Sequence, residues 1–167
     1  MKYAITGHSK NIGKFLYDKL SPNAIGFSRS NGYDINVSRD RKQIIKESDD
    51  CDVFINNAPA GFAQSELCLE LWHKWKNQNK IIINVGSRIA ESNIVLGVDH
   101  SHLLNYSMHK RTLKTLSEDL NKINTPLTVK YKWFGYVGTP EILAKYPHFT
   151  KNDYITIEEA AGIILNE

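Results

Sequence analysis

Tyr106 and Lys110 stand four positions apart in a stretch whose apolar spacing is that of an amphipathic helix. Four residues make just over one helical turn, so the phenol and the ammonium rise from the same face of such a helix. A neighbouring ammonium favours the phenolate and lowers the pKa of a tyrosine from its ordinary value of about 10. The pair could therefore exchange a proton with a substrate at neutral pH, although the same spacing also occurs by chance on solvated helix surfaces.

A glycine-containing segment, TGHSKNIG at residues 6–13, follows the first apolar stretch and leads into a helical pattern. Glycines let the backbone approach a ligand closely, and the free N–H groups of a helix N-terminus attract an anion such as a pyrophosphate. Two glycines six positions apart are weak evidence alone, because glycine also ends strands for structural reasons. Their place between the first strand and the first helix is the one that a dinucleotide-binding fold requires.

The segment Ser28, Arg29 and Ser30 ends the second apolar stretch, about twenty residues after the glycine turn. In dinucleotide-binding folds this position faces the adenosine ribose, where an acid accepts from the 2′-hydroxyl and an arginine accommodates a 2′-phosphate. The segment has an arginine and no acid. We therefore expect NADP(H) to be favoured over NAD(H), with a solvated loop arginine as the alternative.

Apolar runs of strand length alternate with segments of helical period, a pattern typical of an α/β fold with a mainly parallel sheet. Three of the strand candidates are almost continuously apolar, which indicates strands covered on both faces. The predicted strands are 2–6, 24–28, 33–35, 52–58, 80–87 and 127–134, and the predicted helices are 12–20, 39–47, 64–78, about 101–123 and 157–165. With no repeat or linker visible, one doubly wound domain over residues 1–167 is expected.

Five motifs occur in order along the chain, namely TGHSKNIG (6–13), NNAPAG (56–61), INVGS (83–87), YSMHK (106–110) and GYVGT (135–139). Together they resemble the ordered motifs of the short-chain dehydrogenase/reductase family, and they span almost the whole chain. Any one is a weak signal, whereas five in this order on the expected elements are specific. The resemblance implies a Rossmann-type fold and an NAD(P)-dependent oxidoreductase that interconverts a small-molecule carbonyl and an alcohol by hydride transfer. It also implies a homodimer or homotetramer.

The resemblance assigns roles residue by residue. Ser87 matches the serine that hydrogen-bonds the substrate carbonyl, Tyr106 the general acid/base, and Lys110 the lysine that holds the nicotinamide ribose and assists the tyrosine. Tyr106 and Lys110 are also implied cofactor contacts. The other implied cofactor contacts are Gly7, Ser9, Lys10, Asn11, Ile12, Gly13, Ser28, Arg29, Asp34, Ile35, Asn56, Asn57, Ala58, Gly135 and Thr139.

Some features depart from the family pattern. Asn11 stands where the family usually has its middle glycine; Asn tolerates positive φ, but its side chain could weaken pyrophosphate binding. The interval from Asn57 to Ile81 is much shorter than usual, and the asparagine that holds a proton-relay water in the family cannot be placed. The usual last strand is missing, so we expect a fold trimmed at the C-terminus. A catalytically inactive dinucleotide-binding sensor or interaction module is therefore the alternative function, with an isomerase or dehydratase as a third.

The composition indicates no other partner class. A net charge of +3, from 21 basic and 18 interspersed acidic residues, suggests neither a nucleic-acid nor a membrane surface. No segment resembles a membrane span or a signal peptide, and two cysteines without C-x-x-C spacing fit a reducing compartment, so a cytoplasmic protein is expected. His100 and His102 could chelate a metal, but no further ligand cluster lies nearby, and we expect no metal.

The predicted helix from Ser65 to Gln78 is apolar over an unusually wide arc of about 200°. This arc is about twice the stripe needed to cover one sheet, and it carries Leu67, Cys68, Leu69, Leu71, Trp72 and Trp75. Either the helix is deeply buried within a monomer, or one side of it forms a homodimer interface. We favour the interface, because a small domain has few places to bury two tryptophans on two sides.

Overall fold

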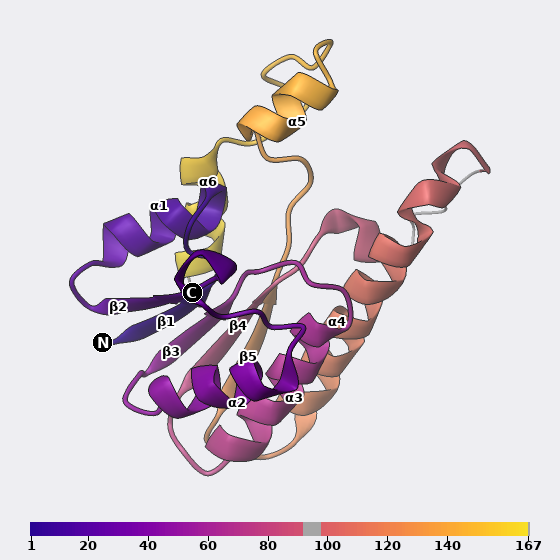
Figure 1. Cartoon of the computed structure of the whole chain (residues 1–167). Helices are drawn as coiled ribbons and strands as arrows, with labels where there is room; N and C mark the ends of the chain where they lie inside the picture. The colour runs from indigo at the N-terminus through magenta and orange to yellow at the C-terminus, as the bar shows by residue number, and fades with distance from the viewer. Residues whose placement is uncertain (92–97, 167) are drawn as a thin grey trace.

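The computed structural model describes residues 1–91 and 98–166. Its strands form one parallel sheet in the order β2-β1-β3-β4-β5 (Figure 1). The strands are β1 (Tyr3–Thr6), β2 (Ala24–Phe27), β3 (Val53–Asn56), β4 (Ile81–Val85) and β5 (Thr128–Lys132). The helices are α1 (Asn11–Leu20), α2 (Ser38–Glu47), α3 (Ala63–Trp75), α4 (Leu104–Lys122), α5 (Pro140–Lys145) and α6 (Ile157–Leu165). The predicted Rossmann-type parallel sheet is confirmed.

Helices cover both faces of the sheet, with α1 and α6 on one face and α2, α3 and α4 on the other (Figure 1). The side chains of successive strand residues point alternately to the two faces of the sheet. Phe54, Ile82 and Val129 belong to the apolar cluster under α3 and α4, whereas Ile55 and Ile83 belong to the cluster under α1 and α6. Burial on both faces explains why these strands are almost continuously apolar in the sequence. Within the described residues, no helix combines the length and the apolar composition needed to cross a membrane.

Residues 33–35 form no strand, contrary to the prediction. The Asp34 carboxylate accepts hydrogen bonds from the backbone and side-chain nitrogens of Asn36 at 3.0 and 2.9 Å, and the backbone N–H of Asp34 donates to Asp40 Oδ2 at 3.0 Å. Asp and Asn side chains that bond the nearby backbone favour turns over strands. The segment is therefore a turn in front of α2, and β2 is an edge strand.

The sequence prediction also misses a short helix, α5. Thr139 caps it, because its side-chain oxygen accepts from the Ile142 N–H at 3.3 Å, and Pro140 occupies the first turn. Both are ordinary start signals for a helix. The other helices begin and end within a few residues of the predicted bounds, except that a 3₁₀ turn over Val98–Leu103 precedes α4.

The wide apolar arc of α3 is buried within the single chain. This helix contacts α2, α4 and the sheet, and Trp72 and Trp75 are 8% and 0% exposed. Of the apolar residues on the arc, Leu69 alone is exposed. The reasoning that placed a homodimer interface on this helix is therefore wrong, since neighbouring helices supply the second partner. The oligomeric state itself stays a prediction.

Arg41 of α2 connects the turn before its own helix to α3. Its guanidinium donates to the Ile35 carbonyl at 2.9 Å and forms ion pairs with Glu66 at 2.7 Å and Glu70 at 3.1 Å. The arginine side chain is 8% exposed. A buried charge of this kind is tolerated because its donors are satisfied. The contacts hold residues 33–37 in place without strand pairing.

We expect Arg41→Met to lower the free energy of unfolding by about 2–3 kcal/mol, because it leaves a buried carbonyl and two carboxylates without their cation. Urea denaturation followed by circular dichroism measures the change. Arg39→Met on the same helix is the matched control. The Arg39 side chain is 88% exposed and, within the described part of the chain, pairs only with Asp40, so its loss should change the free energy by less than about 0.5 kcal/mol. Equal losses in the two variants would contradict the role of Arg41.

Candidate active site

The candidate site lies where the strand order changes direction. The chain moves outward from β1 to β2 on one side of the sheet, and from β3 to β4 and β5 on the other. Ligands of open parallel sheets bind outside the carboxyl ends of the strands at such a point. Residues 7–13 follow β1, residues 57–61 follow β3, and Ser87 follows β4. The predicted cofactor and catalytic motifs therefore share one edge of the sheet.

The glycine turn after β1 packs tightly against the start of α1. Gly7 has a φ of 72°, and a side chain at Gly13 would overlap the Gly7 carbonyl. Ser9 and Lys10 are exposed, whereas Ile12 packs against the core beneath α1. Among the described residues, no side chain caps the N-terminus of α1 and its first turn has no acidic residue. Its free N–H groups can therefore receive an anion.

Asn11 takes the backbone conformation that a glycine would supply. Its φ is 48°, in the left-handed region that Asn tolerates better than most residues. Its side-chain nitrogen donates to Glu141 Oε2 at 3.3 Å, which connects the turn to the start of α5. The turn is thus kept in spite of the missing glycine. An effect of the Asn11 side chain on pyrophosphate binding stays a prediction.

The predicted adenosine contacts gather beyond the carboxyl end of β2. Ser28 Oγ hydrogen-bonds Ser30 Oγ at 2.7 Å, and Arg29 is exposed in the 3₁₀ turn Arg29–Asn31. Hydrogen bonds from Asn36 hold the pKa of Asp34 below its ordinary value, and the positive charge of Arg29 adds to the effect. The structure thus brings Arg29 and Asp34 near each other. Ile35 is buried in the core.

The residues at the end of β3 divide between the site and the core. The side chain of Asn57 donates to the Thr6 carbonyl at 3.1 Å, and the N–H groups of Asn57 and Ala58 donate to Thr6 Oγ1 at 3.0 and 3.1 Å. These bonds hold the segment beside the glycine turn. Asn56 is fully buried, and its side chain donates to Asn84 Oδ1 at 2.8 Å. The Asn56 side chain therefore faces the core, and the cofactor contact of this residue stays a prediction.

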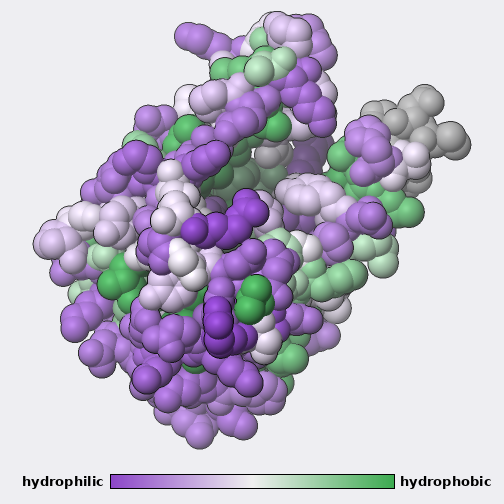
Figure 2. All heavy atoms as spheres, in the orientation of Figure 1, coloured by the Kyte–Doolittle hydropathy of each residue, from purple (hydrophilic) through white to green (hydrophobic). Residues whose placement is uncertain are grey.

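A cavity of about 560 Å³ lies between the end of β4, the start of α4 and the segment 134–146. Ser87 and Tyr106 are in its wall, together with Gly135 and Thr139 from the segment that leads to α5. Figure 2 shows a hollow beneath α5 with a largely hydrophobic visible wall. The remaining lining residues are Gly86, Arg88, Ile89, Leu103, Phe134, Tyr136, Val137, Ile142, Lys145, Tyr146 and Asp153.

Tyr106 and Ser87 lie in the same cavity wall, and the serine hydroxyl is close enough to lower the pKa of the phenol. The backbone N–H of Ser87 donates to the Tyr131 hydroxyl at 3.2 Å, and Ser87 Oγ accepts from the Ile89 N–H at 3.4 Å. Although the Tyr106 ring is partly exposed to the cavity, burial raises the pKa of its phenol, and the nearby Ser87 hydroxyl offsets part of the rise. The prediction that this pKa lies below its ordinary value is therefore wrong, because burial outweighs any effect of the nearby ammonium.

Lys110 lies behind the tyrosine and is 4% exposed. Its Nζ donates to Oε1 of Gln64 at 2.8 Å and to the Val85 carbonyl at 3.0 Å, and it lies 5.7 Å from the centroid of the Tyr106 ring. Burial lowers the pKa of Lys110 to about 8. Two uncharged acceptors therefore hold the amine behind the tyrosine ring. Sequence reasoning missed Gln64, because a glutamine in the first turn of a helix carries no motif.

Aromatic side chains form the outer wall of the cavity. Tyr136 and Tyr146 line it, and Phe149 packs on both, with ring centroids 4.9 Å from Tyr136 and 4.8 Å from Tyr146. Tyr146 and Phe149 are stacked, whereas the other contact is edge-on. Such a wall suits an apolar or planar group next to Ser87 and Tyr106.

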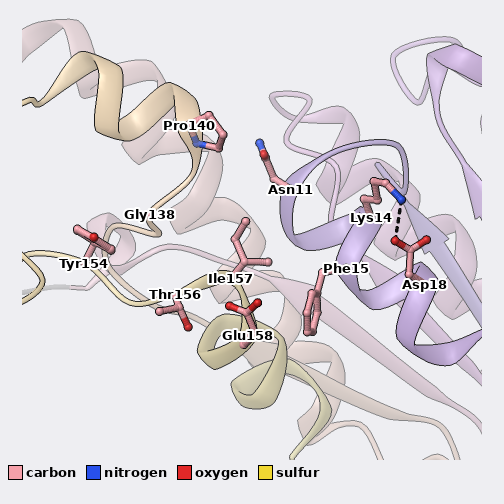
Figure 3. A pocket seen from close by; sticks show the side chains of 10 residues that line it. All are labelled: Asn11, Lys14, Phe15, Asp18, Gly138, Pro140, Tyr154, Thr156, Ile157 and Glu158. Carbon is pink, nitrogen blue, oxygen red and sulfur yellow. Dashed lines mark hydrogen bonds and ion pairs between the residues drawn. The ribbon is translucent and has the colours of Figure 1, made fainter.

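A second cavity, of about 530 Å³, lies between α1, α6 and the loop before α5 (Figure 3). It borders the glycine turn through Asn11, which Figure 3 shows across from Pro140. Lys14 in its wall forms an ion pair with Asp18 at 2.6 Å. Neither Ser87 nor Tyr106 lines it, so it does not share the proposed acid/base groups.

The described part of the chain contains no group of three or more His, Cys, Asp or Glu side chains placed to hold a metal. His102 lies in the 3₁₀ turn before α4 and is exposed. The side chain of His100 lies outside what the structure describes.

Burial of Lys110 makes the stability of the protein depend on pH. The pKa is about 8 in the folded chain against 10.5 in the unfolded chain, so the unfolded chain binds the proton more tightly. The contribution of Lys110 to stability is therefore full above the unfolded pKa and declines as the pH falls toward the folded pKa. Between pH 7 and pH 10 we expect the free energy of unfolding of wild type to rise by roughly 2–3 kcal/mol more than that of Lys110→Met. Urea unfolding of both proteins across this range measures it, and parallel pH profiles would contradict the shift.

No protein-family model matches the sequence, and no curated protein matches it. Solved structures match its fold. The 3-alpha-hydroxysteroid dehydrogenase from Pseudomonas sp. B-0831, solved with NADH, has a TM-score of 0.75 at 19% identity, with 98% of this chain and 88% of that chain covered. A short-chain dehydrogenase/reductase of unknown function from Caenorhabditis elegans, solved with cofactor, has a TM-score of 0.72 at 18% identity, with 98% and 86% covered.

A short chain dehydrogenase from Burkholderia cenocepacia, solved in complex with NADP, has a TM-score of 0.67 at 14% identity, with 98% of this chain and 88% of that chain covered. At these identities the likeness concerns the fold. It extends over nearly the whole chain, as did the five motifs. The chain therefore has the fold of the short-chain dehydrogenases/reductases, and the resemblance noted in its sequence is confirmed at that level.

Proposed function

We propose that this chain is a short-chain dehydrogenase/reductase and an NADP(H)-dependent oxidoreductase that interconverts a carbonyl and an alcohol. The observation that carries the proposal is that Ser87 and Tyr106 lie in the wall of one cavity, with Lys110 at 5.7 Å from the tyrosine ring. The serine follows β4, and the other two residues lie on α4. A solvated surface pair would account for neither the burial of Lys110 nor the nearby serine.

The glycine turn fits a dinucleotide. The positive φ angles of Gly7 and Asn11 form the turn, and the lack of a side chain at Gly13 lets the start of α1 pack directly against the Gly7 backbone. The uncapped start of α1 supplies N–H donors to its oxygens. Arg29 would hold the adenosine end, and Lys110 the ribose beside the nicotinamide. The bound nicotinamide would supply or accept the hydride. NADH in the Pseudomonas structure and NADP in the Burkholderia structure support a cofactor of this type.

Ser87 and Tyr106 act on the oxygen of the substrate carbonyl. Each hydroxyl donates a hydrogen bond to this oxygen, which becomes negative as hydride reaches the carbon. Tyr106 then transfers its proton to the oxygen. Because burial raises the pKa of Tyr106, the phenol carries a proton at neutral pH, which is the state that reduction needs. The ammonium of Lys110 stabilises the phenolate that remains.

The cavity wall favours a carbonyl on an apolar body. Tyr136, Val137 and Ile142 face the same space as the acid/base groups. An apolar or aromatic group placed there leaves the carbonyl as the part of the substrate that meets hydroxyl donors. The same wall carries Arg88, Lys145 and Asp153, so shape and charge both contribute to specificity among such substrates.

The preference for NADP(H) rests on Arg29. An exposed guanidinium next to the second strand can bind a 2′-phosphate through two parallel hydrogen bonds. Asp34 is the nearby acid, and its carboxylate accepts two hydrogen bonds from Asn36 at Oδ1. A carboxylate has no donor for a phosphate, so of these two side chains Arg29 is the one that can donate hydrogen bonds to a 2′-phosphate.

We expect wild type to bind NADPH more tightly than NADH in calorimetric titrations. Arg29→Gln should weaken NADPH binding about 10- to 100-fold, the worth of a charge-assisted phosphate contact, and change NADH binding less than about two-fold. Arg39→Gln, at an exposed arginine of α2, is the control and should change neither affinity. Equal affinities of wild type for NADPH and NADH would contradict the preference for NADP(H). If wild type bound neither cofactor, the proposed oxidoreductase function would be contradicted.

Tyr106→Phe removes the proposed proton donor. Turnover of a panel of aldehydes and ketones, followed by NADPH absorbance, should fall at least about 100-fold, while NADPH affinity changes less than about three-fold. Tyr3→Phe is the control, because Tyr3 lies at the opposite end of β1 and its hydroxyl bonds only Met1 among the described residues. Retained turnover in Tyr106→Phe would show that the assignment is wrong. Wild type that binds NADPH and reduces nothing would favour a binding module without turnover.

A further inference from the structure

The amine of Lys110 is held by two uncharged oxygens, Gln64 Oε1 at 2.8 Å and the Val85 carbonyl at 3.0 Å. Among the described residues it forms no ion pair with a carboxylate. A buried ammonium is strongly destabilising unless its donors are satisfied. These two acceptors therefore decide where the amine lies.

The Gln64 amide has one orientation that satisfies its neighbours. The side chain is 2% exposed, and its Nε2 donates to the carbonyls of Asn56 at 2.7 Å and Val85 at 3.2 Å. Exchanging the amide oxygen and nitrogen would set N–H donors against the ammonium and the oxygen against two carbonyls. The amide oxygen is thus directed at Lys110.

The backbone of Gln64 is fixed as well as its side chain. Its carbonyl accepts from Asn56 Nδ2 at 2.8 Å, and the same Nδ2 donates to Asn84 Oδ1 at 2.8 Å. Asn56 and Asn84 pair across β3 and β4. The acceptor for the lysine is therefore attached to the sheet, next to the end of the strand that leads to Ser87.

Among the residues that the structure describes, no charged group replaces Gln64 as a partner for the lysine amine. Burial raises the pKa of the Tyr106 phenol on α4, that of the Cys68 thiol on α3 to about 11, and that of the Tyr131 phenol on β5 to about 12, so all three are neutral at pH 7. Lys114, one turn further along α4, is itself paired with Glu91 at 3.0 Å. Without Gln64, the amine keeps the carbonyl of β4 as its acceptor and loses the one supplied by α3.

We propose that Gln64 is the positioning residue for Lys110, and that its amide oxygen holds the amine at the place behind Tyr106 where it meets the nicotinamide ribose. The inference rests on the proposed function, which gives the lysine that task. At 2.8 Å the contact is direct, so no water is needed between the amide and the lysine. The segment between β3 and α3 is short, and this brings the first turn of α3 into reach of α4.

The position of the amine can be measured without a substrate. In ligand-free protein with carbon-13 at lysine Cε, NMR titration gives the ionisation midpoint of Lys110, and Lys110→Met identifies its signal. Gln64→Met keeps the length of the side chain and removes the acceptor, so the midpoint should fall by about one pH unit. Gln64→Glu places a carboxylate beside the amine, so the midpoint should rise by at least about one pH unit.

Ser117→Ala is the matched control. Ser117 belongs to the same buried polar network, with bonds to Asn84 at 2.9 Å and to the Leu113 carbonyl at 2.6 Å, and it does not contact Lys110. Its loss should leave the midpoint unchanged. Equal shifts in Ser117→Ala and Gln64→Met, or no rise in Gln64→Glu, would overturn the inference. If Gln64→Met fails to fold, the rise in Gln64→Glu decides alone.

Cofactor binding connects the inference to function. Gln64→Met should weaken NADPH binding about ten-fold by calorimetry. Adding Lys110→Met should weaken binding little further, because Gln64 acts on the cofactor through the amine of Lys110. Independent, additive losses would contradict positioning through the lysine. If wild type binds neither NADPH nor NADH, the proposed function fails, while the lysine titration still decides whether Gln64 holds the amine.

Discussion

The parallel register of the sheet is the constraint on which every functional position depends. Ile55 pairs with Ile83, and Asn56 with Asn84, so β3 and β4 end at the same level. The segments after these strands and after β1 therefore meet at one edge. A slip of one residue would exchange the side chains that face the two helix layers, because they alternate along a strand. Apolar packing on both faces of the sheet thus positions the site as well as the fold.

Beneath that edge runs a buried polar network between the sheet and the helices α3 and α4. The amide of Asn84 donates to Ser117 at 2.9 Å and to the Cys68 sulfur at 3.0 Å, and Asn56 connects it to Gln64. Buried polar groups destabilise a core unless they are hydrogen-bonded, so these bonds favour one arrangement of the helices over others. Asn56 Oδ1 is the member of this network that has no partner among the described residues. The network ends at Lys110, and it therefore connects the packing of the core to the chemistry of the site.

Burial shifts the pKa values of Tyr106 and Lys110 in opposite directions. It raises the pKa of Tyr106, which keeps its proton, and lowers that of Lys110 to about 8. The phenol is thus protonated near neutral pH. The amine remains largely charged near neutral pH, and its acceptors on Gln64 and Val85 are uncharged, so its charge is not neutralised by a partner. A negative charge that forms on the phenol can therefore be stabilised by the lysine.

The sequence by itself determined the strands that form the sheet, the main helices and the order of the motifs, because apolar periodicity and turn chemistry act between near neighbours in the chain. It also predicted a strand at residues 33–35, where the structure has a turn. The motifs alone were enough to name Ser87, Tyr106 and Lys110 as catalytic candidates. Tertiary structure decided what depends on distant contacts. Gln64 and Lys110 are 46 positions apart, and Arg41 and Glu70 are 29 positions apart, so no local sequence pattern predicts either contact. The direction of the Tyr106 pKa follows from the same cause, since burial exists only in the folded chain.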